Sequence, residues 1–341
     1  MSQTLPYAGV LAHYPVDCRP LRHTALGGAG GFSGAALWRM DTPAGDLCLR
    51  RWPPRKPTPA VLRFIHDVLL HCSQRGIHQI PVPLSTNGGA KFVDHARHLW
   101  ELAPWMPGRA DYAARPSTAR LRAAMTLLAD FHNASQSHSE ALTRLNSSPG
   151  LAQRLQQLDD LAQVGGRAIR HHVAPGDWPE LADRAPELLD LFFQLVSRVR
   201  ESVQRVVSRP VRLIPCLRDV WHDHLLFDGD QVTGLVDFGA LRVESPAGDI
   251  ARLLGSLAGD DAATWQAGIG AYVDRRQLSE SERILIPVFD SSSVLLSGMN
   301  WLQWVYVDGR VFEQREVITD RLDALILRLR SMGERPDGII Q

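Results

Sequence analysis

Lysine is nearly missing from the sequence: Lys56 and Lys91 are the two lysines, and arginine supplies the rest of the 37 basic side chains. The 37 acidic side chains balance them, so the net charge gives no indication of a nucleic acid or an anionic membrane as partner. The base composition of the source genome explains this shortage better than a function does. It still has a chemical consequence, because side-chain contacts to phosphate would have to come mostly from arginine.

The sequence also lacks closely spaced cysteines and long apolar runs. Its cysteines are far apart, with no C-x-x-C pair, so neither a disulfide framework nor a zinc site is expected at Cys18, Cys48, Cys72 and Cys216. No stretch approaches the roughly 18 consecutive apolar residues of a membrane helix. The N-terminal residues have no basic region followed by an apolar run, as a signal peptide would. We therefore expect a cytoplasmic protein with no membrane partner.

The first hundred residues predict a small β-rich region with one helix. Short apolar runs separated by turn residues predict strands at 35–40, 47–52, 92–93 and 98–102. Between them, residues 60–72 repeat apolar side chains at helical spacing and end shortly before Gly76, which predicts a helix. The Pro- and Gly-containing segment 103–108 is typical of a stiff connector.

Beyond the connector the chain is mainly helical. Apolar side chains at helical spacing predict helices at 117–134, 151–164 and 181–207, and again from 249 almost to the end. Short apolar strands reappear at 211–214, 225–227 and 232–236. The pattern predicts an α+β fold with a small β-rich N-lobe, residues 1–103, and a larger, mainly helical C-lobe, residues 104–341.

One segment, residues 215–239, carries recognisable chemistry. It places Asp219 in a loop, then a hairpin that turns at Asp228-Gly-Asp, then Asp237 in an Asp-Phe-Gly triplet directly after an apolar strand. Phosphoryl transfer needs a carboxylate to orient and deprotonate the attacking hydroxyl, and further ligands to hold Mg²⁺ against the phosphates. Two carboxylates joined by a short hairpin meet that need. The ordered combination is much more specific than an isolated Asp-Phe-Gly.

This segment resembles the catalytic region of the aminoglycoside phosphotransferase and choline kinase-like family, whose members share the bilobal protein-kinase-like fold. The family pattern is His-Gly-Asp-x-x-x-x-Asn, a hairpin, Ile-Asp-Phe/Trp and a later Pro-x-x-Asp-Leu-Ala. The resemblance implies that Asp219 is the catalytic base and Asp237 a Mg²⁺ ligand. It also implies that Asp249, in Ser-Pro-Ala-Gly-Asp-Ile-Ala, braces the catalytic loop. ATP or GTP is the implied donor, and a hydroxyl of a small molecule the implied acceptor.

The resemblance extends into the N-terminal region. Gly28, Gly30 and Ser33 fall on the nucleotide-covering loop of the family, where glycine lets backbone N–H groups approach phosphates. Arg50 falls on the strand position that holds a lysine in the protein kinases, and a guanidinium there can hold two phosphate oxygens. Without the resemblance, the loop would be an ordinary hairpin turn, and Arg50 and Arg51 a solvated pair on a strand.

Two further segments match the family. Residues 99–108 resemble its hinge, so backbone groups from Glu101 to Ala103 are expected to pair with the adenine edge. Residues 127–132, Leu-Leu-Ala-Asp-Phe-His, resemble the end of its Leu-Ala-x-Leu-His helix. The resemblance therefore covers most of the chain.

Three departures from the family pattern matter. Leu217 replaces the His of His-Gly-Asp, which is largely a backbone brace. His224 falls on the metal-binding Asn, although Mg²⁺ prefers oxygen ligands. His224 can therefore bind a softer ion such as Mn²⁺, touch phosphate as a cation, or mark a lost metal position. The helix that should offer a Glu to the strand arginine offers His66 and Asp67 instead, and a buried structural role fits His66 at least as well as a functional one.

The sequence leaves several functions open beside the kinase. A catalytically degenerate nucleotide-binding or regulatory protein would explain the missing Asn. A metal-dependent hydrolase built on His222, His224 and Asp237 would act without a nucleotide. Tryptophans could also form a cage for a quaternary amine, since cations bind aromatic faces. The basic stretch 165–175 favours a neutral or anionic acceptor over a polycationic drug, and no motif specifies the acceptor or an oligomeric state.

Overall fold

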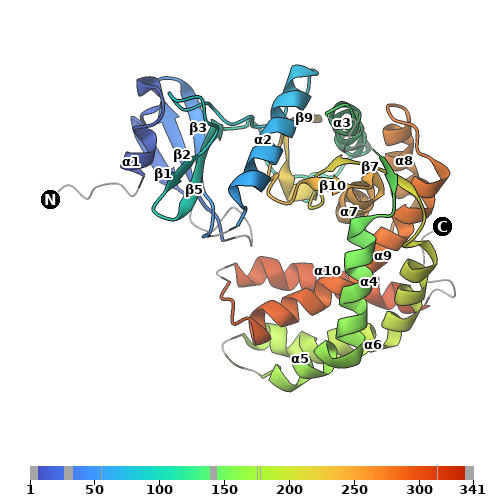
Figure 1. Ribbon diagram of the computed structural model, residues 1–341. Coiled ribbons are helices and arrows are strands. Elements are labelled where there is room, and N and C mark those ends of the chain that lie inside the picture. Colours follow the sequence, from blue (N-terminus) through green and yellow to red (C-terminus); the bar gives the residue numbers. More distant parts are fainter. Residues whose placement is uncertain are drawn as a thin grey trace. The chain divides into compact units, whose positions relative to one another are not determined.

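The computed structural model describes residues 7–26, 34–54, 56–138, 144–174, 176, 178–312 and 314–334. They form two compact units, each made of two stretches of chain. The first unit comprises residues 1–138 and 222–242, and the second comprises residues 139–221 and 243–341. An antiparallel sheet lies near the N-terminus and the C-terminal part is mainly helical, which confirms the α+β class (Figure 1). The lobe boundary expected after residue 103 stays a prediction.

The first unit is built on a five-stranded antiparallel sheet in the order β1-β2-β3-β5-β4. Its strands are β1 (Arg22–Ala25), β2 (Ala36–Thr42), β3 (Gly45–Arg51), β4 (Val93–His95) and β5 (His98–Pro104). The β2–β3 hairpin turns at Gly45, whose φ of 104° favours glycine. Met40, Leu49 and Leu102 are fully buried in the core on the sheet. The four strands expected in this region are confirmed, and β1 is an addition.

Two helices and a second hairpin complete the first unit. Helix α2 (Pro59–Gln74) starts at the N-cap Thr58 and packs Leu62 against Trp52 and Leu99 of the sheet region. It contacts α3 (Thr118–Gln136), which in turn contacts β9. Short elements also belong to this unit: the helix α1 (Ala8–Leu11), the 3₁₀ turns Val16–Cys18 and His222–His224, and the hairpin of β8 (Leu225–Asp228) and β9 (Gln231–Leu235).

The second unit is a helical assembly with a small sheet in the order β10-β7-β6. Its helices are α4 (Pro149–Asp160), α5 (Gly166–His172), α6 (Pro179–Val206), α7 (Pro246–Ala258), α8 (Ala262–Val273), α9 (Glu280–Leu302) and α10 (Arg315–Glu334). Its strands are β6 (Arg144–Asn146), β7 (Val211–Cys216) and β10 (Arg242–Glu244), and π-helical turns occupy Leu161–Gly165 and Gln303–Val307. The mostly buried α9 starts with a Ser279–Glu282 capping box and contacts α6, α7 and α10 (Figure 1). Within the described ranges, no helix has the length and apolarity needed to cross a membrane.

Candidate functional site

The strand arginine and the aspartate of Asp-Phe-Gly meet in the first unit. Arg50 lies near the end of β3, and Asp237 follows β9 by two residues. The Arg50 Nη1 atom lies 3.3 Å from Asp237 Oδ1, and both side chains are mostly buried, with 16% and 24% of their surface exposed. The guanidinium also lies over the Trp52 ring, 4.7 Å from its centroid. The fold therefore joins two residues that stand 187 positions apart in the sequence.

The Asp-Phe-Gly triplet is held by its own packing. Asp237 has a φ of 65°, in the left-handed region that non-glycine residues rarely adopt. Phe238 is buried and lies 6.0 Å from Phe131 of α3, ring centroid to ring centroid. At Gly239 an added Cβ would lie 3.0 Å from the Trp52 ring, so only glycine fits there without displacing that ring. The triplet thus fixes the direction of the Asp237 carboxylate.

A glutamate of the sheet, Glu101, lies beside Arg50. Glu101 of β5 is the cross-strand partner of Arg50 on β3, and Arg50 Nε lies 3.9 Å from Glu101 Oε1. The other oxygen, Oε2, lies 2.6 Å from Nε2 of His66 on α2. Both His66 and Glu101 are buried, at 3% and 8% exposed. A chain of contacts therefore runs from helix α2 through Glu101 to Arg50 and on to Asp237.

The two neighbouring carboxylates keep the Arg50 side chain charged. Burial acts to lower the pKa of the guanidinium, but the carboxylates of Asp237 and Glu101 outweigh burial and raise the pKa overall. Sequence reasoning assigned Glu101 a backbone contact to adenine and missed its side chain. The register of β3 against β5, which places Glu101 opposite Arg50, is the signal that reveals this role.

His224 lies beside Asp237 at the end of the 3₁₀ turn that precedes β8. Its Nε2 atom is 3.9 Å from Asp237 Oδ2, and 14% of its side chain is exposed. The backbone N–H of Val236 donates to the His224 carbonyl at 2.9 Å, which ties the turn to the segment before Asp237. A carboxylate oxygen and an imidazole nitrogen thus lie near one another. This pair fits a divalent cation that takes its other ligands from phosphates, and the nitrogen suits Mn²⁺ better than Mg²⁺.

The remaining residues that the sequence predicts to bind the nucleotide lie in two places. Glu101 and Ala103 lie on β5, opposite Arg50 and Cys48 of β3, and the carbonyl of Leu102 between them accepts the N–H of Leu84 at 2.8 Å. Their predicted backbone contacts to adenine stay a prediction. The expected glycine-rich loop positions lie outside the described residues: Gly28, Gly30 and Ser33.

In the second unit, Asp249 holds the loop that carries Asp219. Asp249 lies in the first turn of α7, is 1% exposed, and accepts the N–H groups of Leu217 and Arg218 at 2.7 and 2.6 Å. Arg218 has a φ of 65°, so the loop turns sharply just before Asp219. The geometry agrees with the bracing role implied for Asp249. On this loop, 54% of the Asp219 side chain is exposed, and Asp219 Oδ1 lies 3.2 Å from Nη2 of Arg252.

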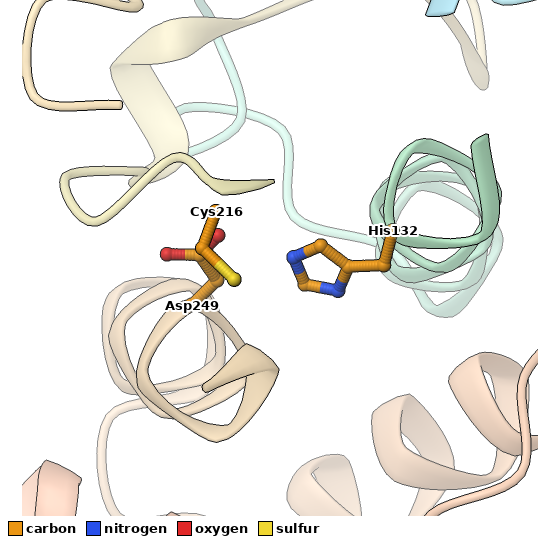
Figure 2. A group of neighbouring side chains, drawn as sticks. All are labelled: His132, Cys216 and Asp249. Atoms are coloured by element: carbon orange, nitrogen blue, oxygen red, sulfur yellow. The ribbon is translucent and has the colours of Figure 1, made fainter. Parts of the chain in front are cut away.

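Cys216 lies next to Asp249 at the end of β7 (Figure 2). The sulfur and a carboxylate oxygen of these two residues lie within 4.8 Å of one another. Burial raises the pKa of the Cys216 thiol well above its usual range, and the sulfur lies 3.2 Å from the Glu244 carbonyl, to which it donates. The thiol thus acts as a hydrogen-bond donor within the second unit. His132, also drawn in Figure 2, is a residue of α3 in the first unit.

The two hydrogen bonds that Asp249 accepts allow a prediction about thermal stability. Asp249→Ala leaves two buried N–H groups without their charged acceptor, a loss of about 2–4 kcal/mol, so we expect Tm to fall by about 5–10 °C. Asp261→Ala is the matched control, because this exposed aspartate caps α8 by accepting the N–H of Thr264 and braces no catalytic loop. If thermal unfolding shows no larger loss for Asp249→Ala than for Asp261→Ala, the bracing role is wrong.

Comparisons with known proteins find solved structures of the same fold. An aminoglycoside phosphotransferase from Alicyclobacillus acidocaldarius subsp. acidocaldarius DSM 446 matches at 17% identity and a TM-score of 0.55, over 98% of each chain. A microcompartment-associated aminopropanol kinase matches at 15% identity and a TM-score of 0.64, over 97% of each chain. Amicoumacin kinase, solved with AMP-PNP and Ca²⁺, matches at 16% identity and a TM-score of 0.60, over 93% of this chain and 91% of its own.

At these identities the solved structures establish the kinase-like fold alone. No curated protein matches the sequence. The sequence model of the phosphotransferase enzyme family matches residues 24–281, which is well over half of the chain. This chain therefore belongs to the phosphotransferase enzyme family.

Proposed function

We propose that this protein transfers the γ-phosphate of ATP or GTP to a hydroxyl group of a small molecule. The observation that carries the proposal is the contact of Arg50 with Asp237. Arg50 also lies near the carboxylate of Glu101. In kinase-like enzymes, a strand cation paired with a glutamate contacts the nucleotide phosphates, and the aspartate of Asp-Phe-Gly holds the metal ion beside them. The family match supports phosphoryl transfer as the reaction class.

On the donor side, Arg50 binds phosphate oxygens through its two-pronged guanidinium. Asp237 is the proposed ligand of the Mg²⁺ or Mn²⁺ ion that accompanies the nucleotide, and His224, whose Nε2 lies 3.9 Å from Asp237 Oδ2, is the proposed second ligand. When bound, the ion neutralises charge on the phosphates. The nucleotide contacts of Glu101 and Ala103 are backbone contacts in this proposal. The AMP-PNP complex of amicoumacin kinase and the ADP complex of spectinomycin phosphotransferase support a nucleotide donor, as findings on those two proteins.

On the acceptor side, Asp219 is the proposed base. The hydroxyl proton of the acceptor moves to a carboxylate oxygen of Asp219 while the hydroxyl oxygen forms a bond to the γ-phosphorus. The bond from that phosphorus to the bridging oxygen breaks, and the electron pair leaves with the nucleoside diphosphate. Asp219 suits this role because its carboxylate is exposed on a loop that Asp249 holds in place.

A second candidate is a nucleotide-binding protein without transferase activity, which His224 in place of the family Asn favours. Both candidates predict that ATP or GTP raises Tm in the presence of Mg²⁺ or Mn²⁺. A ligand at a hundredfold excess over Kd stabilises the folded state by about 2.7 kcal/mol, which is a shift of several degrees. We expect a metal-dependent shift in a thermal unfolding titration, and its loss in Asp237→Ala.

The release of ADP or GDP with a panel of alcohols then separates the candidates. Alcohol-dependent release of the diphosphate supports the transferase, whereas a shift without release supports the binding protein. Absence of any nucleotide-induced shift, with either metal, would contradict both. Hydrolytic activity that needs a metal but no nucleotide would instead point to the histidine site at His222 and His224.

A further inference from the structure

Helix α9 is buried along most of its length, except for one narrow polar stripe. Between residues 288 and 302, every residue is buried apart from Ser293, Ser297 and Asn300, which are partly exposed. Their spacing of four and then three residues puts them on the same face of the helix. The part of this stretch that solvent reaches is therefore lined by neutral hydrogen-bonding groups.

Helix α4 contacts this stripe (Figure 1). Nη2 of Arg154 donates to the Ser293 hydroxyl at 2.9 Å, and Nε2 of Gln157 donates to Oδ1 of Asn300, also at 2.9 Å. Both side chains of α4 are partly exposed as well. Together the two helices form a half-buried polar seam, which consists of Arg154, Gln157, Ser293, Ser297 and Asn300.

The seam has hydrogen-bonding capacity that the chain itself does not use. Asn300 uses its amide oxygen and Gln157 its amide NH₂ in their mutual contact, so the NH₂ of the first and the oxygen of the second are left over. The Ser297 hydroxyl donates to the Ser293 carbonyl at 2.7 Å and can still accept. Within the described part of the chain, these leftover groups have no other protein partner. Half-buried groups of this kind bind water or a ligand.

The seam begins beside the loop that carries Asp219. Gln153 of α4 accepts a hydrogen bond from Nη2 of Arg218 at 3.1 Å. The one residue precedes Arg154 of the seam, and the other precedes Asp219. Burial lowers the pKa of Arg154 to about 10, and the positive charges of Arg218 and Arg252 contribute to this shift. Since Arg252 contacts Asp219 at 3.2 Å, a molecule bound along the seam has one end near the proposed base.

The seam contains one guanidinium group and no carboxylate. The acidic side chains nearest to it along the two helices contact other partners: Asp159 with Arg200, Asp160 with Gln156, and Asp290 with Arg328. An acceptor with several ammonium groups would therefore find no anionic partner in the seam. An apolar acceptor would leave the amide and hydroxyl groups unpaired, which costs binding energy. Neutral hydroxyl groups, which both donate and accept, match the seam.

Both helices of the seam pass directly into a π-helical turn. Helix α4 continues into the turn Leu161–Gly165, and α9 continues into the turn Gln303–Val307. Such turns interrupt α-helices frequently at functional sites. Their occurrence in both helices agrees with a binding role for the seam.

We propose that the polar seam binds the acceptor and that the acceptor is a polyol, a molecule with several neutral hydroxyl groups. This inference rests on the proposed function, because one hydroxyl lies at Asp219 to receive the phosphoryl group while others bind the seam. The NH₂ of Asn300 donates to one such hydroxyl, and the oxygen of Gln157 accepts from another. The stripe from Ser293 to Asn300 extends about 10 Å along α9, so the acceptor has at least the size of a six-membered ring.

Ligand-observed saturation-transfer NMR tests the binding without turnover. The probes are myo-inositol, glucose and sorbitol, each measured with the protein saturated with AMP-PNP and Mg²⁺ and again without nucleotide. Saturation transfer from the wild type to at least one of the three is expected. In the Gln157→Ala/Asn300→Ala double variant it should fall about threefold or more, since two hydrogen bonds are lost. Transfer to none of the probes, or equal transfer from both proteins, would overturn the proposal.

The number of hydroxyl groups is tested with three alcohols built on one ring: cyclohexanol, 1,2-cyclohexanediol and myo-inositol. With ATP as donor, we expect kcat/KM for ADP release to rise about tenfold or more from the first to the last, the effect of two neutral hydrogen bonds. Release with cyclohexanol that equals or exceeds release with myo-inositol would contradict a polyol acceptor.

Two neighbouring glutamines of α4 separate substrate binding from a structural role. Gln157→Ala changes a seam residue, whereas Gln156→Ala changes an exposed glutamine that contacts Asp160. Gln157→Ala is expected to raise KM for the polyol about 2- to 10-fold, the loss of one neutral hydrogen bond, with kcat and KM for ATP as in the wild type. Gln156→Ala should change none of these constants. An equal rise of the polyol KM in both variants, or a loss of kcat alone, would show that α4 acts through the fold and overturn the proposal.

Failure of the polyol site and failure of the kinase give different results. Polyol binding that depends on Gln157 and Asn300, without any nucleotide-induced rise in Tm, would overturn the proposed kinase and leave the polyol site standing. A nucleotide-induced rise in Tm, together with polyol signals that the double variant does not change, would overturn the polyol site and leave the kinase standing.

Discussion

Asp219→Asn is expected to lower kcat about 10²–10³-fold while nucleotide binding stays intact. Asparagine keeps the size of the side chain but cannot accept the hydroxyl proton, so the proposed transfer loses its base. The loop itself should keep its shape, because Asp249 holds it through the backbone N–H groups of Leu217 and Arg218 and not through Asp219. The effect should therefore appear in the chemical step alone.

Two measurements, the Tm shift with ATP and kcat, define this result on three variants. The metal-dependent Tm shift with ATP should persist in Asp219→Asn and disappear in Asp237→Ala, because the two aspartates have different proposed roles. Asp228→Asn makes the same chemical change at the exposed end of β8 and should leave kcat as in the wild type. Turnover by Asp219→Asn within a few-fold of the wild type would remove Asp219 from the mechanism.

The sequence predicts those parts of this molecule that short stretches of chain encode. Strands β2, β3 and β5 and helix α2 carry apolar side chains with the period of their structure, and the structure confirms each of them. Strand β1 was missed because all four of its residues are exposed, which leaves no alternation to recognise. Strands β6 and β10 have three residues each, with a single apolar side chain between two polar ones, so they lack the apolar run by which the sequence indicated β4.

The residues of the candidate site, like the strands and helices, could be predicted from the sequence only in part. Asp219, Asp237 and Asp249 could be proposed from linear spacing, because a loop, a hairpin and a helix start hold them in a fixed order. The side-chain role of Glu101 could not, because it depends on the register between β3 and β5, two strands about fifty residues apart. The same holds for the polar seam, because its members on α4 and α9 meet only when the two helices have packed.

The side-chain role of Glu101 gives the second large expected effect. Glu101→Gln removes one of the two carboxylate charges that contact Arg50, so the arginine is expected to turn toward Asp237 and away from the nucleotide. We expect kcat/KM for ATP to fall about 10–100-fold, the loss of one charged contact at the phosphates. His66→Gln should cost less, because Glu101 keeps its charge and loses one of its two partners.

A double-mutant cycle shows whether Glu101 acts through Arg50 or merely supports the fold. If it acts through Arg50, Glu101→Gln has little further effect in an Arg50→Gln background, and the coupling lies within about 0.5–3 kcal/mol. Asp67→Asn is the matched control, because Asp67 neighbours His66 on α2 but is exposed. Additive losses in the cycle, or an equal loss from Asp67→Asn, would show that β5 supplies no brace. Coupling would show that a strand glutamate held by a helix histidine replaces the helix glutamate of the family pattern, with Arg50 in place of the strand lysine.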